Sequence, residues 1–274
     1  ALALYHRVLP PMLHAETANP KLELDKTPFY LSTTPRPWVH GRRDVPRRAG
    51  VNAFGFGGIN AHAILEEHTG VDEKTLPRLE TDGPVERDVD SAEDRDALVQ
   101  TVQQMVAWLD KAGDVSLLDV AASAAQQPGK TRLAIVANDV ADLRKKLDTA
   151  AQRLAEPERD KIQDRGGVFW YAEPLAAEGR VAFMFPGEGA QYANMLSDLC
   201  RHFPEVRREF DLTDEAFARA EFPQPLSRLI FPLPDETERA EEELRELGGA
   251  VTSVTLAERA LMALLRTLEI KPQS

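Results

Sequence analysis

The stretch Asn52-Ala53-Phe54-Gly55-Phe56-Gly57-Gly58-Ile59-Asn60-Ala61-His62 combines closely spaced glycines with aromatic and apolar residues. Glycines let the backbone bend sharply and bring its N–H groups close to a ligand. Phenylalanine rings around such donors suit an apolar acyl chain that ends in a reacting carbonyl, whose developing negative charge the N–H groups would stabilise. The alternative is a tight turn that packs both phenylalanines into a core, and the residues alone favour neither reading.

A second glycine-rich stretch is Phe183-Met184-Phe185-Pro186-Gly187-Glu188-Gly189-Ala190-Gln191. The apolar run Val181–Phe185 before it predicts a buried strand of a parallel sheet, and Met195 and Leu199 lie in a helical pattern after it. A strand, a glycine turn and a helix N-terminus together form an anion trap. The spacing is neither G-x-G-x-x-G nor GxxxxGK[ST], so nucleotide binding is weakly supported. Glu188 would repel a phosphate, but its N–H could still serve an oxyanion.

Composition excludes several classes of protein. With 274 residues, 43% hydrophobic and 28% charged, the chain is long enough for two globular domains or one large one. Its net charge of -12 argues against a nucleic-acid partner, and its single cysteine, Cys200, excludes an internal disulfide. No uninterrupted apolar run approaches the roughly 20 residues that cross a bilayer, so no membrane span is predicted. We also expect no metal site.

The ends of the chain predict an internal piece of a larger protein. Ala1–Tyr5 opens within an apolar periodic segment, and Ile270–Ser274 follows directly on a strongly apolar helical pattern. Domain ends are more often polar and tolerant of fraying. The alternative is a processed or trimmed chain.

Residues 1–70 read as the tail of a helix, an extended Pro-rich passage and the first glycine motif. The helix is expected to continue until Pro10-Pro11 stops it, and Phe29–Thr33 is expected to be a strand. Arg42-Arg43 and Arg47-Arg48 form a basic patch, for which we predict a solvated surface loop.

The middle of the chain reads as a linker followed by a small α/β adapter. Residues 71–92 are polar, acidic and poor in large apolar groups, which is typical of a linker. Residues 93–175 contain helical patterns that begin near Asp94, Ser116 and Asn138-Asp139, and apolar strands at Leu133–Ala137 and Val168–Tyr171. No catalytic constellation stands out there. From residue 180 onward we predict part of an α/β sheet, a solvated acidic helix at 235–243 and a buried helix at 256–265.

Pro46–Glu67, which contains the first motif, closely resembles the C-terminal end of a type I polyketide synthase ketosynthase. The same family is matched in order by four upstream segments: Val8–Pro11, Asn19–Leu22, Phe29–Leu31 and Arg36–Trp38. Val181–Met195 resembles the opening of the malonyl-type acyltransferase that follows in such synthases. The region between resembles the ketosynthase–acyltransferase linker, and Leu256–Pro272 resembles the helix before the acyltransferase nucleophile elbow.

The resemblance implies an α/β chain of three parts: a thiolase-like ketosynthase C-terminal end at 1–70, a small α/β linker domain at 71–178, and an incomplete α/β acyltransferase domain at 179–274. It implies that the backbone N–H of Phe56 helps form the ketosynthase oxyanion hole while its ring lines the acyl pocket. The N–H of Glu188 has the corresponding role in the acyltransferase. The neighbouring residues are implied to bind substrate: Gly57, Gly58, Gly187, Gly189 and Gln191.

The position of Glu188 departs from the common pattern, because most relatives carry Gln there. This departure resembles the branch that makes polyunsaturated or heterocyst-glycolipid acyl chains. The family's ketosynthase Cys and its two His would lie before Ala1, and its acyltransferase Ser, in a G-H-S-x-G elbow, would follow Ser274. No G-x-S-x-G occurs in the chain, and Cys200 matches neither nucleophile.

By resemblance, the parent is a cytoplasmic homodimer that uses malonyl-CoA-type substrates and a phosphopantetheine-bearing acyl carrier protein. This segment binds no cofactor itself, its partners are the carrier protein and the rest of the ketosynthase and acyltransferase, and without a nucleophile it is expected to be inactive alone. The alternatives are a non-catalytic scaffold that spaces domains and docks a carrier protein, and an independent nucleotide-binding α/β protein. We expect residues 1–70 to be stable only when wrapped on residues 93–175, and 180–274 to present an open sheet edge.

Overall fold

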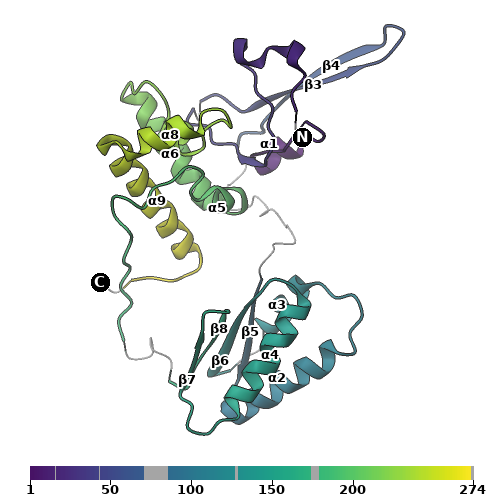
Figure 1. Ribbon diagram of the computed structural model, residues 1–274, viewed down its shortest axis with the longest axis vertical. Coiled ribbons are helices and arrows are strands. Elements are labelled where there is room, and N and C mark those ends of the chain that lie inside the picture. Colours follow the sequence, from purple (N-terminus) through teal and green to yellow (C-terminus); the bar gives the residue numbers. More distant parts are fainter. Residues whose placement is uncertain (16, 43, 71–85, 127–128, 174–178, 273–274) are drawn as a thin grey trace. The chain divides into compact units, whose positions relative to one another are not determined.

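A computed structural model describes residues 1–15, 17–42, 44–70, 86–126, 129–173 and 179–272. The chain divides into two compact units, one built from Ala1–Glu80 with Ala182–Gln273 and the other from Thr81–Val181. The first unit therefore combines segments that are far apart in the sequence, whereas the second, which we call the adapter, is continuous (Figure 1).

The adapter is an antiparallel sheet with helices along one side (Figure 1). Its elements, in chain order, are β5 (Glu86–Ala92), α2 (Arg95–Leu109), α3 (Leu117–Ala124), β6 (Thr131–Ala137), α4 (Val140–Leu154), β7 (Lys161–Asp164) and β8 (Val168–Tyr171). The strand order is β5-β6-β8-β7, and every neighbouring pair is antiparallel.

The adapter has its own core, as its apolar periodicity predicts. Leu133 and Ile135 alternate with less buried residues along β6, so that one face of the sheet is apolar. Leucines and a valine four or seven residues apart on α2 and α4 cover that face, and Trp170 of β8 completes the core. The predicted helix starts are confirmed at Asp94 and Asp139, whose carboxylates accept the N–H groups of residues 97 and 142. Ser116 precedes α3 but makes no side-chain cap hydrogen bond.

The predicted linker at 71–92 is wrong at its end, because Glu86–Ala92 is the strand β5. It pairs along its whole length with β6, from Glu86 opposite Ala137 to Ala92 opposite Thr131. No apolar pattern predicted β7 either. Both are edge strands, which commonly carry polar residues, so main-chain pairing rather than an apolar pattern defines them. Residues 71–85 lie outside the described residues.

The first unit contains helices of different lengths and two small two-stranded antiparallel sheets. In its N-terminal part lie α1 (Leu2–His6), β1 (Val8–Leu9), two 3-10 turns (Pro20–Leu22 and Leu24–Lys26), β2 (Arg36–Pro37), β3 (Arg48–Phe54) and β4 (Asn60–Glu66). In its C-terminal part lie α5 (Ser197–His202), α6 (Pro204–Arg219), α7 (Leu226–Ile230), α8 (Thr237–Arg245) and α9 (Leu247–Thr267). β1 pairs with β2, and β3 pairs with β4.

The helices α5 to α9 enclose the core of this unit. Phe210 of α6 stacks on Phe231, with ring centroids 5.1 Å apart, and Leu256 and Ala260 of α9 pack into the same cluster. The acidic stretch forms α8, which buries only Ala240 and Leu244 and leaves most of its carboxylates in water, as predicted. By length and composition alone α9 could cross a membrane, but a core helix passes the same test, and α9 contacts α6, α7 and α8.

Three local predictions in the first unit are wrong. The first helix ends at His6 rather than at the prolines, because Arg7 takes a left-handed conformation with φ 55° and Val8–Leu9 joins β2. Phe29–Thr33 and Val181–Phe185 do not form strands. An apolar run becomes a strand only where another strand accepts its hydrogen bonds, and the described part of this unit offers only the two short sheets.

The expectation that residues 1–70 wrap on the adapter stays a prediction, but the structure gives these residues partners within the first unit. Their described long-range contacts include Arg36 with the carbonyls of Phe231 and Pro232, and Arg47 with Asp211 of α6. Buried polar groups in the N-terminal part thus find their partners in 182–272. The α/β class of the chain is confirmed, whereas the described residues 179–272 are helices and loops without the predicted sheet edge.

Candidate functional site

The first glycine motif is the turn of the β3–β4 hairpin. Phe54 lies opposite Asn60, and the Gly55 N–H donates to the Ile59 carbonyl at 2.8 Å. Gly57 and Gly58 have φ of 92° and 91°, a conformation that side-chain-bearing residues rarely adopt. The sharp backbone bend that the motif predicts is therefore present.

The aromatic residues of this turn are uncovered. Phe54 is 72% exposed and Phe56 fully exposed, so the alternative of a turn that packs both rings into a core is wrong in this structure. The same hairpin also exposes Val51, Ile59 and Ile64. A two-stranded hairpin with bare apolar side chains is marginal by itself, which makes it a surface suited to further strands or a partner. The oxyanion and pocket roles of Phe56 stay predictions.

The two histidines that the sequence analysis considered, His62 and His14, do not lie in a catalytic arrangement in the described part of the chain. His62 Nδ1 lies 2.5 Å from Asn52 Oδ1, its cross-strand neighbour on the exposed hairpin. His14 lies in a loop with φ 57°. This geometry gives His62 a hydrogen-bonding role in the hairpin and places neither histidine next to a described nucleophile.

The second glycine motif is a loop held by Gln191. The Gly189 N–H, at φ 99°, donates to Gln191 Oε1 at 2.8 Å, and Gln191 Nε2 donates to the Leu244 carbonyl at 3.0 Å. Gln191 therefore ties this loop to the end of α8. Gly187 and Glu188 are exposed. The prediction that a helix begins directly after the turn is wrong: α5 begins only at Ser197, after Leu196 in a left-handed conformation, so no helix N-terminus lies at the glycines.

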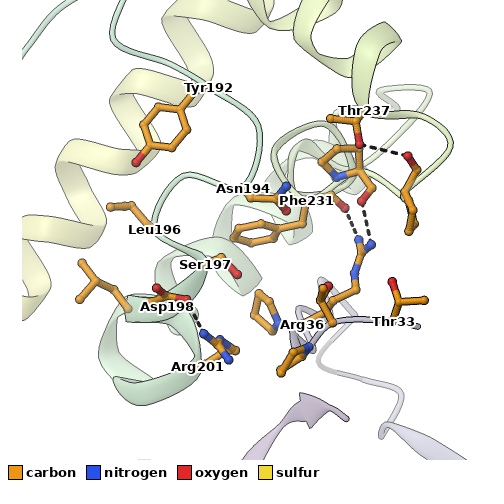
Figure 2. Close-up of a pocket in the computed structure, with 16 residues that line it drawn as sticks. Thr33, Arg36, Tyr192, Asn194, Leu196, Ser197, Asp198, Arg201, Phe231 and Thr237 are labelled. Atoms are coloured by element: carbon orange, nitrogen blue, oxygen red, sulfur yellow. Dashed lines mark hydrogen bonds and ion pairs between the residues drawn. The ribbon is translucent and has the colours of Figure 1, made fainter. Parts of the chain in front are cut away.

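The sequence did not indicate a cavity of about 770 Å³ between the Pro-rich passage and α5 (Figure 2). Figure 2 shows Arg36 pointing into the loop after α7, where its guanidinium donates to the carbonyls of Pro232 at 2.7 Å and Phe231 at 2.5 Å. Burial lowers the pKa of Arg36. Asp198 pairs with Arg201 on the opposite wall. The described lining residues of this cavity include no histidine or cysteine.

The basic patch is not a single solvated surface. Arg48 pairs with Glu66, and Arg42 with Asp44, on exposed positions. Arg47, in contrast, is only 5% exposed and lies between two carboxylates. Its Nη1 lies 3.0 Å from Glu67 Oε2, and its Nη2 lies 3.1 Å from both carboxylate oxygens of Asp211. The prediction was wrong for Arg47 because the partners come from distant parts of the chain.

The two carboxylates respond differently to burial. Burial acts to raise the pKa of Glu67, but the charge and hydrogen bonds of Arg47, with the charge of Arg7, hold it below its usual value. Burial raises the pKa of Asp211 despite the attraction of Arg47. Arg7 Nε donates to Glu67 Oε1 at 2.7 Å, so Glu67 is surrounded by two guanidinium groups.

Cys200 lies in α5 and is fully buried. Burial raises the pKa of its thiol far above the usual range, which disfavours the nucleophilic thiolate. The sequence matched Cys200 to neither nucleophile of the family, and its role stays a prediction. In the part of the chain that the structure describes, no group of three or more His, Cys, Asp or Glu residues is placed to hold a metal ion.

The family described as the ketoacyl-synthetase C-terminal extension matches residues 18–136. A polyunsaturated fatty acid synthase polypeptide from Thraustochytrium is 30% identical over 235 residues, which is 78% of this chain and 8% of that protein. A phenolphthiocerol/phthiocerol polyketide synthase polypeptide from Mycobacterium tuberculosis is 32% identical over 222 residues, which is 79% of this chain and 14% of that protein. The chain is a type I polyketide synthase segment.

The segment comes from the ketosynthase–acyltransferase linker region, as the resemblance predicts. A solved structure, the acyl transferase domain of ZmaA, has a similar fold, with a TM-score of 0.55 and 21% identity over 69% of this chain and 40% of that one. The polyketide synthase segment thus spans only a small part of the curated relatives quoted above.

Proposed function

We propose that the parent of this segment is a synthase that loads malonyl-type units onto an acyl carrier protein and condenses them into polyketide or fatty-acyl chains. The observation that carries the proposal is the similarity of nearly four-fifths of the chain to a polyketide synthase and to a polyunsaturated fatty acid synthase. In this proposal residues 1–70 end the ketosynthase, 71–178 form the linker domain and 179–274 begin the acyltransferase. The parent works as a cytoplasmic homodimer.

The bare β3–β4 hairpin supports the ketosynthase assignment. Its strands are unpaired on their outer edges within the described sheet, and it exposes Val51, Phe54, Phe56 and Ile64. Further strands of the ketosynthase would cover these side chains and use the free edges. The turn would then present the Phe56 N–H to the oxyanion of the condensing acyl group, with Gly57 and Gly58 supplying the bend.

The loop at Gly187–Gln191 supports an acyltransferase role that is completed by further chain. The Glu188 N–H would stabilise the oxyanion of the malonyl ester, and Gln191 would hold the loop through Gly189 and Leu244. Glu188 in place of Gln favours the branch that makes polyunsaturated or glycolipid acyl chains. The 32% identity to a phenolphthiocerol/phthiocerol polyketide synthase supports other polyketide products to a similar degree.

The segment by itself acts as a scaffold in this proposal. The adapter has its own core, and Cys200 is buried with its thiolate disfavoured. Covalent acyl transfer requires an activated nucleophile, which the family supplies from outside this stretch. The isolated chain is therefore expected to space catalytic domains and dock a carrier protein without forming an acyl-enzyme.

The test is incubation with malonyl-CoA followed by intact-mass analysis. The isolated chain is expected to gain no mass, while the parent with its G-H-S-x-G serine is expected to gain one malonyl group. A serine-to-alanine variant of that elbow is the matched control and should lose the adduct. A stoichiometric adduct on the isolated chain would overturn the scaffold role, and a parent that loads no malonyl group would overturn the acyltransferase proposal.

A further inference from the structure

Arg47 lies at the root of the β3–β4 hairpin. It directly precedes β3, and Glu67 directly follows β4. The Glu67 N–H donates to the Arg47 carbonyl at 2.9 Å, and the Arg47 N–H donates to Glu67 Oε2 at 3.3 Å. With the guanidinium–carboxylate contacts, these bonds close the two strands onto each other at the end opposite the glycine turn.

The same guanidinium also holds helix α6. Its Nη2 donates to both oxygens of Asp211, and its Nε donates to the Trp38 carbonyl at 3.0 Å. The strap formed by residues 36–42 lies against this helix at two consecutive residues. The His40 N–H donates to Asp211 Oδ1 at 2.6 Å, and Gly41 lies so near that a Cβ on it would be 2.5 Å from Asp214 Cβ.

The Arg47 guanidinium thus donates hydrogen bonds to three different groups at the same time. Arg47 reaches Glu67, Asp211 and the Trp38 carbonyl with its planar set of donors, and all of these charged groups are at least nine-tenths buried. A lysine carries the same charge but cannot bridge two carboxylates with a rigid fork. Because a buried charge that loses its partner is strongly unfavourable, the hairpin root and α6 are held together as a unit.

We propose that Arg47 is a positioning residue that fixes the direction of the β3–β4 hairpin relative to helix α6. The inference rests on the proposed function, in which Phe56 works at the hairpin tip and α6 belongs to the acyltransferase portion. It goes beyond that function by coupling the two: the ketosynthase oxyanion donor keeps its place because a buried arginine anchors the hairpin to the neighbouring catalytic portion.

The direct test measures the hairpin direction in the full chain. Cysteines replace Ala61 on the hairpin and Ala218 on α6, which are both exposed, and spin labels on them report a distance distribution. Cys200 is fully buried and does not compete for the label. We expect the distance distribution to be narrow in the labelled chain without further substitutions. It should broaden when Arg47→Lys or Asp211→Asn is added.

Two matched variants serve as controls. Arg48→Lys changes the adjacent arginine, whose pair with Glu66 is exposed, and Asp214→Asn neutralises the next buried aspartate of α6, which bonds to Ser227 instead. Both should keep the narrow distribution. Asp211→Asn retains an oxygen for the His40 N–H, so it decides the matter if Arg47→Lys does not fold. An unchanged distribution in folded Asp211→Asn protein overturns the proposal.

A second readout uses the intact synthase. In Asp211→Asn the rate of malonyl loading should stay near that of the parent, while the condensation kcat falls on the order of tenfold or more, since a misplacement of about 1 Å can cost that much. Equal loss of both rates would indicate general destabilisation and overturn the positioning role. A parent synthase that neither loads nor condenses would instead refute the proposed function and leave the distance result standing.

Discussion

The strap passes close to helix α6 at Gly41, and this proximity makes a strong prediction for Gly41→Ala. A Cβ at this position would lie 2.5 Å from Asp214 Cβ, 2.7 Å from the Asp214 carbonyl carbon and 2.9 Å from the Glu215 nitrogen. Two of these atoms are helix backbone and cannot turn aside. To reach ordinary carbon contact the strap has to recede by about 1 Å.

That movement carries a definite energetic cost. The neighbouring His40 N–H bond to Asp211, now 2.6 Å, would stretch to about 3.6 Å, beyond hydrogen-bonding range. Losing a bond to a charged acceptor costs about 1.5–3 kcal/mol, and overpacking costs about 1–3 kcal/mol. We therefore expect Gly41→Ala to lower the free energy of unfolding of the first unit by about 3–5 kcal/mol.

The assay is native-state hydrogen exchange in increasing urea, read by mass spectrometry on separate peptides from α6 and α4. Protection of α6 should fall in Gly41→Ala, while protection of α4 in the adapter should not change. The matched control is Gly248→Ala in the first turn of α9, where a Cβ meets nothing within 4 Å and alanine should stabilise the helix by less than about 1 kcal/mol. A loss below about 1 kcal/mol for Gly41→Ala, or an equal loss in α4, would refute the reasoning.

Three further predictions concern single buried side chains. Burial raises the pKa of Asp214 to about 6, so between about pH 4 and pH 6 the folded first unit holds a proton on Asp214 that the unfolded chain has lost. The free energy of unfolding should therefore fall by on the order of 3 kcal/mol as the pH rises through this range, and then level off. Urea titrations should show this pH dependence in the unsubstituted chain and not in Asp214→Asn. Cys200 should not react with a thiol reagent in the native chain and should react at the rate at which the first unit unfolds, since burial raises the pKa of its thiol; fast labelling of folded protein would contradict this. Trp170→Phe should destabilise only the adapter, by about 1–2 kcal/mol, through loss of the 2.9 Å bond from Nε1 to Thr131 and of the contact with the Arg95 guanidinium; the check is α4 protection, with α6 as the internal control.

In the adapter, local apolar spacing was enough to predict most of the helices and strands. Leu98, Val102, Leu143 and Leu147 repeat at helical spacing, and their faces are buried as the spacing predicts. The apolar run Leu133–Ala137 lies entirely within strand β6. Asp139, two residues later, is the N-cap of helix α4. The spacing of apolar residues and the capping of helices depend only on residues close together in the sequence, so they can be predicted without knowing the rest of the structure.

Elements that depend on distant partners could not be read in this way. The polar strand β5 exists because β6 accepts its hydrogen bonds, whereas apolar Val181–Phe185 is not a strand because no described strand lies beside it. The large cavity beside Arg36 likewise joins residues near positions 35, 195 and 232. The sequence did not indicate these tertiary contacts, because the type of a residue does not say which distant segment supplies its hydrogen-bonding or packing partner.

The candidate site divides along the same line. Residue types and spacing alone determined the family resemblance, the sharp turns at Gly57-Gly58 and Gly189, and the expectation that Cys200 is no nucleophile, because backbone freedom and motif identity reside in a few adjacent residues. Tertiary structure decided that Phe56 stands uncovered, that α5 begins away from the glycines, and that Arg47 is buried between Glu67 and Asp211. An arginine in a basic run is solvated or buried according to whether distant carboxylates reach it, and only the folded chain brings Asp211 to Arg47.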